Sequence, residues 1–304
     1  MQRIIPWDIL VGLIAKHAPS GVNGRPPFPV PVMLRIHFMQ QWFGLSDPAM
    51  EEALHDTPIY REFASLDAGI TRIPDESTIL RFRRLLEEHK LADQMLAAVN
   101  VTLVQAGLLL KAGTAVDATL IPAPSSTKNN DAARDPEMTS SKKGNNYHFG
   151  MKAHIGVDIE SGLVHTVHTT TGSSHDVTQA HELLHGEEKM VFADSGYRGV
   201  TKREEIQAQE NQPQWHVAMM PSKRKQLDTG TALGALYEKL EKIKAGVRAK
   251  VEHPFQVIKC QWHYRKTRYK GLFKNTMQIV TLFALSNLWM ARRALLSQQL
   301  GARG

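Results

Sequence analysis

The sequence predicts a mixed α/β chain, in which a sheet with helices on both faces follows an all-helical N-terminal domain. Apolar residues of the first hundred positions recur at helical spacing, and from about residue 112 the pattern changes to β-branched, alternating runs. Three such runs come in succession, and later ones alternate with helical segments, which is typical of a mixed sheet. We therefore expect domains at 1–111 and 112–274, and a C-terminal helix at 275–304.

Helix start signals support the N-terminal part. Ser46 or Asp47 can cap a helix that has a proline in its first turn, and Asp75 precedes another helix with one apolar face. The basic residues that fall mainly off that face are Arg81, Arg83 and Arg84. Two interpretations stay equally open: a helix-turn-helix-like DNA-binding module, and a packing domain whose charged helix face is simply solvated.

The central part contains five expected strands, three in succession and two that alternate with helices. The expected strands are "GTAVDATLIPA", "NYHFGMKAHIGVD", "GLVHTVHTT", "KMVFADSG" and "QWHVAMM", and the expected helices are "SSHDVTQAHELLHG" and "VTKREEIQAQ". Residues 124–146 are polar without apolar periodicity, which favours a mobile loop. The order of elements matches a ribonuclease H-like mixed sheet with helices on both faces, an analogy that concerns the fold alone.

A long helical region runs from about residue 231 to the end, with interruptions expected near Pro254 and around 264–272. The stretch 275–291 carries no charge, but its Asn, Gln, Ser and Thr residues favour a buried helix over a membrane span. Cys260 is the single cysteine, which fits a reducing cytosol, and the N-terminus lacks a signal-peptide pattern. We expect a cytoplasmic protein without a membrane partner.

Positive charge is concentrated in one segment. Residues 222–274 hold fourteen Lys or Arg and four acids, a net +10, whereas the whole chain carries +7, so the remainder sums to −3. The stretches 222–226 and 264–271 contain basic residues without interleaved acids. In the second stretch, Tyr264 and Tyr269 offer stacking surfaces beside the cations. This pattern favours nucleic acid as the partner over a solvated face. The candidate DNA-binding residues in these stretches are Lys223, Arg224, Lys225, Arg265, Lys266, Arg268 and Lys270.

Three acids stand out by their positions. Asp117 lies inside the first strand, Asp194 ends the fourth strand run, and Glu252 lies on the late helix. A buried carboxylate needs compensation, and Mg²⁺ prefers oxygen ligands together with water and substrate phosphate. Two such ions can activate a water or a 3′-hydroxyl in phosphoryl transfer. Each acid alone is also explained as a strand-edge, turn or surface residue, but their joint order favours a metal site.

Cations flank the third acid. Arg248 precedes Glu252 by four residues and Lys259 follows it by seven, so that a regular helix would place all three on one face. Pro254 is expected to kink that helix or to start a new turn near residue 251. Arg198, which follows Asp194, either touches phosphate or pairs with a local acid.

The sequence gives less support to three other kinds of site: a histidine metal site, a nucleophilic serine and a nucleotide-binding loop. His165 and His168 are three apart in a strand and face opposite sides, which argues against a shared metal site. The sequence contains neither a Gly-x-Ser-x-Gly nucleophile motif nor a P-loop, so we expect no nucleotide cofactor.

The chain resembles bacterial insertion-sequence transposases of the DDE type, in the insertion-sequence-five group. The resemblance covers nearly the whole length, and its carriers are "RIHFMQQWFGLSDPAMEEAL", "IPDESTILRFRRLLE", "VDATLIPAPSSTKN", "ADSGYRG", "VEHPFQVIK" and "YRKTRYKGL". It implies that Asp117, Asp194 and Glu252 are the catalytic, metal-binding triad, and that Arg248 and Lys259 help bind transposon ends.

The function that follows is a DNA transposase that uses Mg²⁺ or Mn²⁺, with two ions expected. It would bind terminal inverted repeats, cleave there and join the ends to target DNA, as a homodimer in a synaptic complex. Two alternatives stay open: a ribonuclease H-like nuclease or resolvase, and a non-catalytic DNA-binding regulator derived from a transposase.

Overall fold

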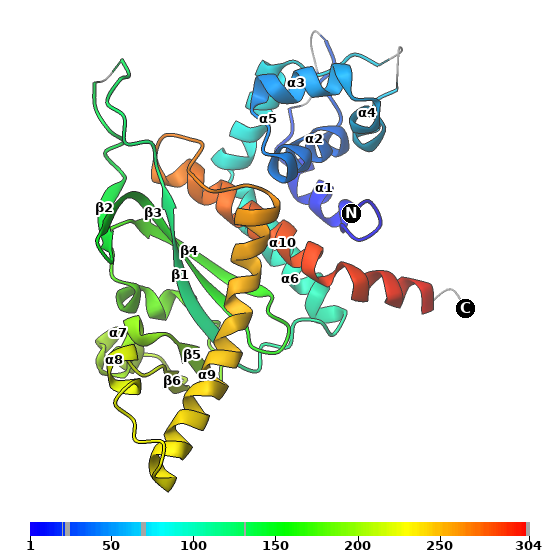
Figure 1. Ribbon diagram of the computed structural model, residues 1–304. Coiled ribbons are helices and arrows are strands. Elements are labelled where there is room, and N and C mark those ends of the chain that lie inside the picture. Colours follow the sequence, from blue (N-terminus) through cyan, green and yellow to red (C-terminus); the bar gives the residue numbers. More distant parts are fainter. Residues whose placement is uncertain (20, 22–24, 68–70, 131, 302–304) are drawn as a thin grey trace. The chain divides into compact units, whose positions relative to one another are not determined.

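The computed structural model describes residues 1–304 except 20, 22–24, 68–70, 131 and 302–304, and it divides into two compact units. The helical unit comprises Met1–Thr102, Ile258–Tyr264 and Met277–Gly304, and the sheet unit comprises Leu103–Val257 and Arg265–Thr276. Figure 1 labels their helices and strands.

The helical unit begins with short amphipathic helices. These are α1 (Trp7–Ala15), α2 (Val30–Phe43), α3 (Asp47–Asp56), α4 (Pro58–Ala64), α5 (Glu76–Glu88) and α6 (Leu91–Gln105), the last of which ends in the sheet unit. Helices α2 to α5 share one apolar core, which includes Ile36, Met39, Met50, Leu54 and Ile79. Each of these side chains is at most 2% exposed, so burial of this core holds the four helices together.

The start signals of this unit are confirmed. The Ser46 side chain accepts a hydrogen bond from the Ala49 N–H at 3.3 Å, and Asp75 accepts one from Thr78 at 2.7 Å. Arg83 differs from the expectation, because it turns inward and pairs with Asp47 at 2.7 Å and with Glu87 at 3.1 Å. Arg81 and Arg84 remain exposed on α5.

Helix α10 (Leu272–Gly301) belongs to the helical unit from Met277 onward. It is long and apolar enough to cross a membrane, yet 67% of its most apolar window is buried inside the protein. Its buried amides are paired within the unit: Asn287 donates to Asn100 at 2.9 Å, and Gln278 donates to Gln41 at 3.2 Å. The expectation that this stretch is a buried helix is confirmed.

The sheet unit is built on a six-stranded mixed sheet. Its strands are β1 (Thr114–Pro122), β2 (Thr139–Lys143), β3 (Asn146–Asp158), β4 (Val164–Thr171), β5 (Met190–Ala193) and β6 (Gln214–Val217). The order is β2-β3-β1-β5-β6, and β4 pairs with the second half of β3. Pairing is antiparallel among β1 to β4 and parallel among β1, β5 and β6. The expected mixed sheet is confirmed, but β2 lies where a loop was expected.

The two faces of this sheet are covered by different elements. One face packs against the 3₁₀ helices η1 (Asp176–Leu183), η2 (Ser195–Tyr197) and η3 (Val200–Lys202) and against α7 (Glu204–Gln207). The second face contacts α9 (Ala232–Gln256), which lies along β1, β3 and β5 (Figure 1). The two helices expected before and after β5 are thus shorter and more tightly wound than their patterns indicated.

Helix α9 continues through Pro254 to Gln256, so no new turn begins near residue 251. An irregularity follows the proline, in the π-helix η4 (Val257–Gln261). Residues 262–271 then separate η4 from α10, as the sequence indicated.

Candidate active site

Two aspartates lie beside each other where the short strand β5 ends next to β1. Val116 of β1 is the register partner of Ala193 of β5, and Asp117 and Asp194 are the residues that follow. Strand β1 continues to Pro122, so Asp117 lies inside its strand, whereas Asp194 lies just beyond the end of the neighbouring one. The charge of Asp194 acts on Asp117, so the two carboxylates lie close to one another. On the other side, Asp117 pairs with Ile155 of β3, which holds it within the sheet.

The chain turns sharply after Asp194. Asp194 caps η2, where its Oδ1 accepts the Gly196 N–H at 2.7 Å. A Cβ atom on Gly196 would lie 2.9 Å from that same oxygen, and Gly199 has φ of +81°, so both positions favour glycine. The glycines therefore allow the aspartate to be presented at the strand end.

Burial raises the pKa of Asp117 from 3.8 to about 6, partly offset by a hydrogen bond from the Ala118 N–H at 2.7 Å. The negative charge of Asp194 raises the pKa further, and the positive charge of Arg248 lowers it. The two neighbouring carboxylates therefore repel each other, and a cation beside them would be stabilising.

Two residues outside the predicted triad also lie here: Asp176, whose position at a helix N-terminus made it a weaker candidate acid in the sequence, and Tyr197, which the sequence did not single out. Asp176 at the start of η1 acts electrostatically on Asp117, and Lys152 holds it at 2.8 Å. Tyr197 is fully buried, and its hydroxyl has no hydrogen-bond partner among the residues that the structure describes. Burial raises the pKa of Tyr197 well above 10.0, with further contributions from Asp176, Asp117 and Asp194.

Helix α9 contributes Arg248 to this region, since the positive charge of Arg248 acts on Asp117. Arg248 is half-buried, and its Nε is buried without a hydrogen-bond partner among the described residues. Glu252 is exposed one helical turn later, on the same side of α9. Lys259 lies beyond the end of α9 in the π-helical turn of the helical unit, so the regular helical phase does not extend to it.

Family models cover most of the chain. Residues 109–288 match the family described as "Transposase DDE domain", which is more than half of the sequence. The chain belongs to the DDE transposase family. Residues 1–85 of this transposase match a second family, "Transposase domain (DUF772)". No solved structure matches the chain.

A second cluster of possible metal ligands lies elsewhere in the transposase. Ligand atoms of His165, His185 and Glu188 fall within 4.8 Å of one another. The Glu188 carboxylate already accepts N–H groups of His185 at 2.6 Å and Gly186 at 2.8 Å, and a hydroxyl from Thr114 at 3.2 Å. Burial lowers the pKa values of both histidines, so that they are neutral. These hydrogen bonds account for the cluster as a structural anchor of the turn before β5.

The two basic stretches predicted from the sequence lie in different parts of the transposase. Lys223 and Arg224 lie in α8 (Pro221–Arg224) and Lys225 follows it, while Arg265, Lys266, Arg268 and Lys270 lie between η4 and α10. Arg224 is held by Glu238 through two contacts of 2.8 and 3.0 Å. The Arg198 guanidinium contacts the sulfur of Met220. Tyr264 is only 1% exposed, so the expectation that it offers a stacking surface is wrong.

Proposed function

We propose that this transposase binds the terminal inverted repeats of an insertion sequence, cleaves the DNA at those ends and joins them to target DNA. The observation that supports it most is the pair of neighbouring carboxylates, Asp117 inside β1 and Asp194 just after β5, with Arg248 acting on the same site from α9. The motifs resemble the insertion-sequence-five group, and membership of that group is part of the proposal.

Asp117, Asp194 and Glu252 would hold the divalent cations. The two aspartates fit such a ligand, because their carboxylates repel each other and each accepts a hydrogen bond from its own segment, at 2.7 Å in both cases. Bound Mg²⁺ or Mn²⁺ supplies activation of a water or a 3′-hydroxyl and stabilisation of the leaving oxygen, with two ions expected. Glu252 would complete the set from α9.

The cations around the acids would bind DNA phosphate. Arg248 is half-buried beside Asp117, where a guanidinium can form a bidentate contact with a phosphate. Lys259, Arg198 and the basic segments around α8 and before α10 would hold the flanking duplex. The transposase would work as a homodimer in a synaptic complex on nucleoid DNA in the cytoplasm, without a nucleotide cofactor.

The test uses duplex DNA that carries the element's own ends, with and without Mg²⁺ or Mn²⁺. Asp194→Ala should leave end binding intact and abolish cleavage, whereas Glu210→Ala, an exposed acid elsewhere in the sheet unit, should cleave normally. Undiminished cleavage by Asp194→Ala would overturn the assignment. Cleavage of branched DNA without end specificity would point to a nuclease or resolvase, and binding without any cleavage would point to a regulator.

A further inference from the structure

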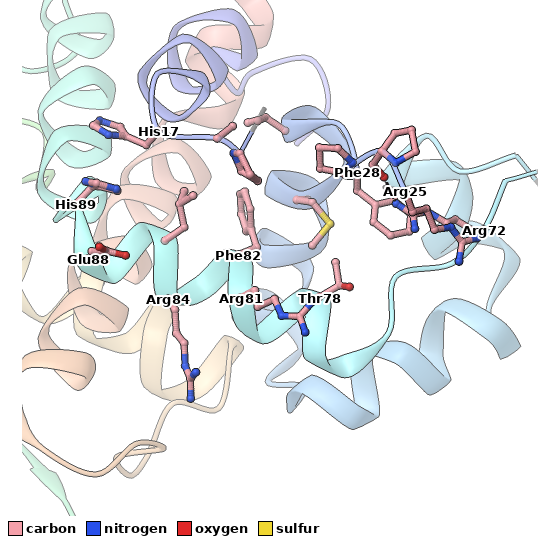
Figure 2. A pocket seen from close by; sticks show the side chains of 17 residues that line it. His17, Arg25, Phe28, Arg72, Thr78, Arg81, Phe82, Arg84, Glu88 and His89 are labelled. Atoms are coloured by element: carbon pink, nitrogen blue, oxygen red, sulfur yellow. Dashed lines mark hydrogen bonds between the residues drawn. The ribbon is translucent and has the colours of Figure 1, made fainter. Parts of the chain in front are cut away.

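The helical unit contains a hollow that the catalytic proposal does not use. It has a volume of about 640 Å³ and lies between α5 and the segments 17–19 and 25–30. Its apolar lining comprises Phe28, Val30, Met33, Phe82 and Leu85. Figure 2 shows Phe82 directed from α5 into this hollow, with Arg25 and Arg72 beside Phe28 and with Arg81 and Arg84 projecting from α5.

The lining of this pocket is strongly basic. Four arginines line it, namely Arg25, Arg72, Arg81 and Arg84, against the single acid Glu88. Arg83 lies between two of them in sequence but turns into the core, where it pairs with Asp47 and Glu87. The remaining arginines of α5 are therefore the ones that face solvent at the pocket.

Aromatic groups are arranged around the apolar floor. The Arg72 guanidinium lies 4.0 Å from the centre of the Phe28 ring and donates to the Pro26 carbonyl, which keeps that ring at the edge of the pocket. The rings of His17 and His89 stack at 4.0 Å on the opposite part of the lining. The pocket thus combines flat apolar surfaces with guanidinium groups.

We infer that this pocket holds one unpaired nucleotide of a DNA strand, with the base against Phe28 and Phe82 and the phosphate at the arginines. Base stacking on aromatic rings beside cations is how proteins hold single strands, and the volume falls in the usual range of ligand pockets. A base in an intact duplex cannot enter a hollow, so duplex DNA would reach only the rim. The inference rests on the proposed function, since that function brings DNA to the helical unit.

Thr78 allows a test that preserves the fold. It lines the pocket at the third position of α5, where its N–H is bound by the Asp75 cap. Glutamate is favourable in the first turn of a helix, so Thr78→Glu adds a negative charge at the pocket lining, while it removes the hydrogen bond between the Thr78 side chain and Asp75. Ser77→Glu is the matched control, because it adds the same charge to the same helical turn and also removes a side-chain hydrogen bond to Asp75, but does not line the pocket.

Binding is measured by fluorescence anisotropy with full-length protein, a short labelled single-stranded oligonucleotide and the blunt duplex of the same sequence. Thr78→Glu should weaken single-strand binding at least about tenfold, since a carboxylate repels phosphate at short range. Ser77→Glu should change it less than about twofold, and duplex binding, carried by the basic segments of the sheet unit, should change little in either variant.

Equal single-strand affinity of the two variants would overturn the inference, provided that both show the helical content and melting temperature of the parent. Displacement of the oligonucleotide by free dAMP would identify a mononucleotide as the preferred ligand, and displacement by unlabelled oligonucleotide alone would identify a DNA strand. If the unaltered protein neither binds nor cleaves the duplex, the proposed function itself is contradicted. This result is distinct from equal affinities of the two variants, which contradict only the inference about the pocket.

Discussion

Asp117 and Asp194 are each the first residue beyond a register pair of adjacent parallel strands, Val116 with Ala193. This relationship brings two carboxylates together, although 76 intervening residues separate them in the chain. Burial is the main cause of the raised pKa of Asp117, and the Asp194 charge raises it further.

Asp117 should reduce the stability of the metal-free transposase at neutral pH. Its pKa is about 6 in the folded protein against 3.8 as the ordinary value, so between these values the folded state binds more protons than the unfolded state. The free energy of unfolding therefore falls as pH rises through this window. Asp117→Asn should melt higher than the parent above about pH 7 and gain nothing below about pH 4. Melting curves in EDTA check this, and a lower melting temperature of the variant at neutral pH would contradict it.

Tyr197→Phe should slow DNA cleavage without lowering the stability of the fold. The Tyr197 hydroxyl is buried without a partner among the described residues, and such a group costs about 1–3 kcal/mol, so its removal should leave the melting temperature equal or higher. Because that hydroxyl lies among Asp117, Asp194 and Asp176, its loss should slow cleavage about tenfold or more.

Tyr264→Phe, which alters a buried tyrosine of the helical unit, serves as the control for this comparison. It should leave the cleavage rate unchanged. Equal rates for the Tyr197 variant and the parent would remove Tyr197 from the site.

Arg248→Met should affect the pH profile of cleavage as well as its rate. Arg248 lowers the pKa of Asp117, so without it that pKa should rise and the ascending limb of the rate profile should move to higher pH. We expect the maximal rate to fall at least about tenfold, because a phosphate-binding cation is lost. Lys242→Met, at a side chain of 72% exposure on the same helix, should change neither quantity. An unshifted profile for Arg248→Met would argue against its role.

The basic residues at α8 should differ in their contribution to DNA binding. Lys223 and Lys225 are exposed, whereas Arg224 is neutralised by Glu238 at 2.8 Å. Lys223→Ala with Lys225→Ala should reduce the slope of log affinity against log salt by about 2, and Arg224→Ala should reduce it by less than about 1. Affinities at several salt concentrations provide the measurement, and a larger effect of Arg224→Ala would refute the ranking.

Asp47→Asn should destabilise the helical unit. It removes the carboxylate that lies 2.7 Å from the buried Arg83 guanidinium and leaves Glu87 as the remaining acid. Loss of a charged hydrogen bond in this setting costs about 1.5–3 kcal/mol. Glu88→Gln, at an exposed position on α5, should have little effect on urea unfolding. Comparable midpoints for the two variants would show that the Arg83 pair contributes no stability.

Local patterns were sufficient for much of the fold. Helix caps at Ser46 and Asp75 are set by residues within one turn, and most of the sheet was indicated by β-branched, alternating or short apolar runs. Strand β2 was missed because residues 139–143 lack apolar alternation and are ordered by pairing with β3. The burial of Tyr264 could not be predicted, because the local sequence around a tyrosine beside basic residues is the same whether its side chain is buried or exposed.

The sequence by itself determined that this chain is a two-part α/β protein of the DDE transposase family, with acids at a strand interior, a strand end and a late helix. Such features are local, since alternation, caps and motif strings depend on neighbouring residues. Tertiary structure decided which charges meet: strand register set Asp117 beside Asp194, η1 brought Asp176 and its partner Lys152, and burial removed the Tyr197 hydroxyl from water. These relationships depend on long-range pairing and desolvation, which no stretch of sequence encodes alone.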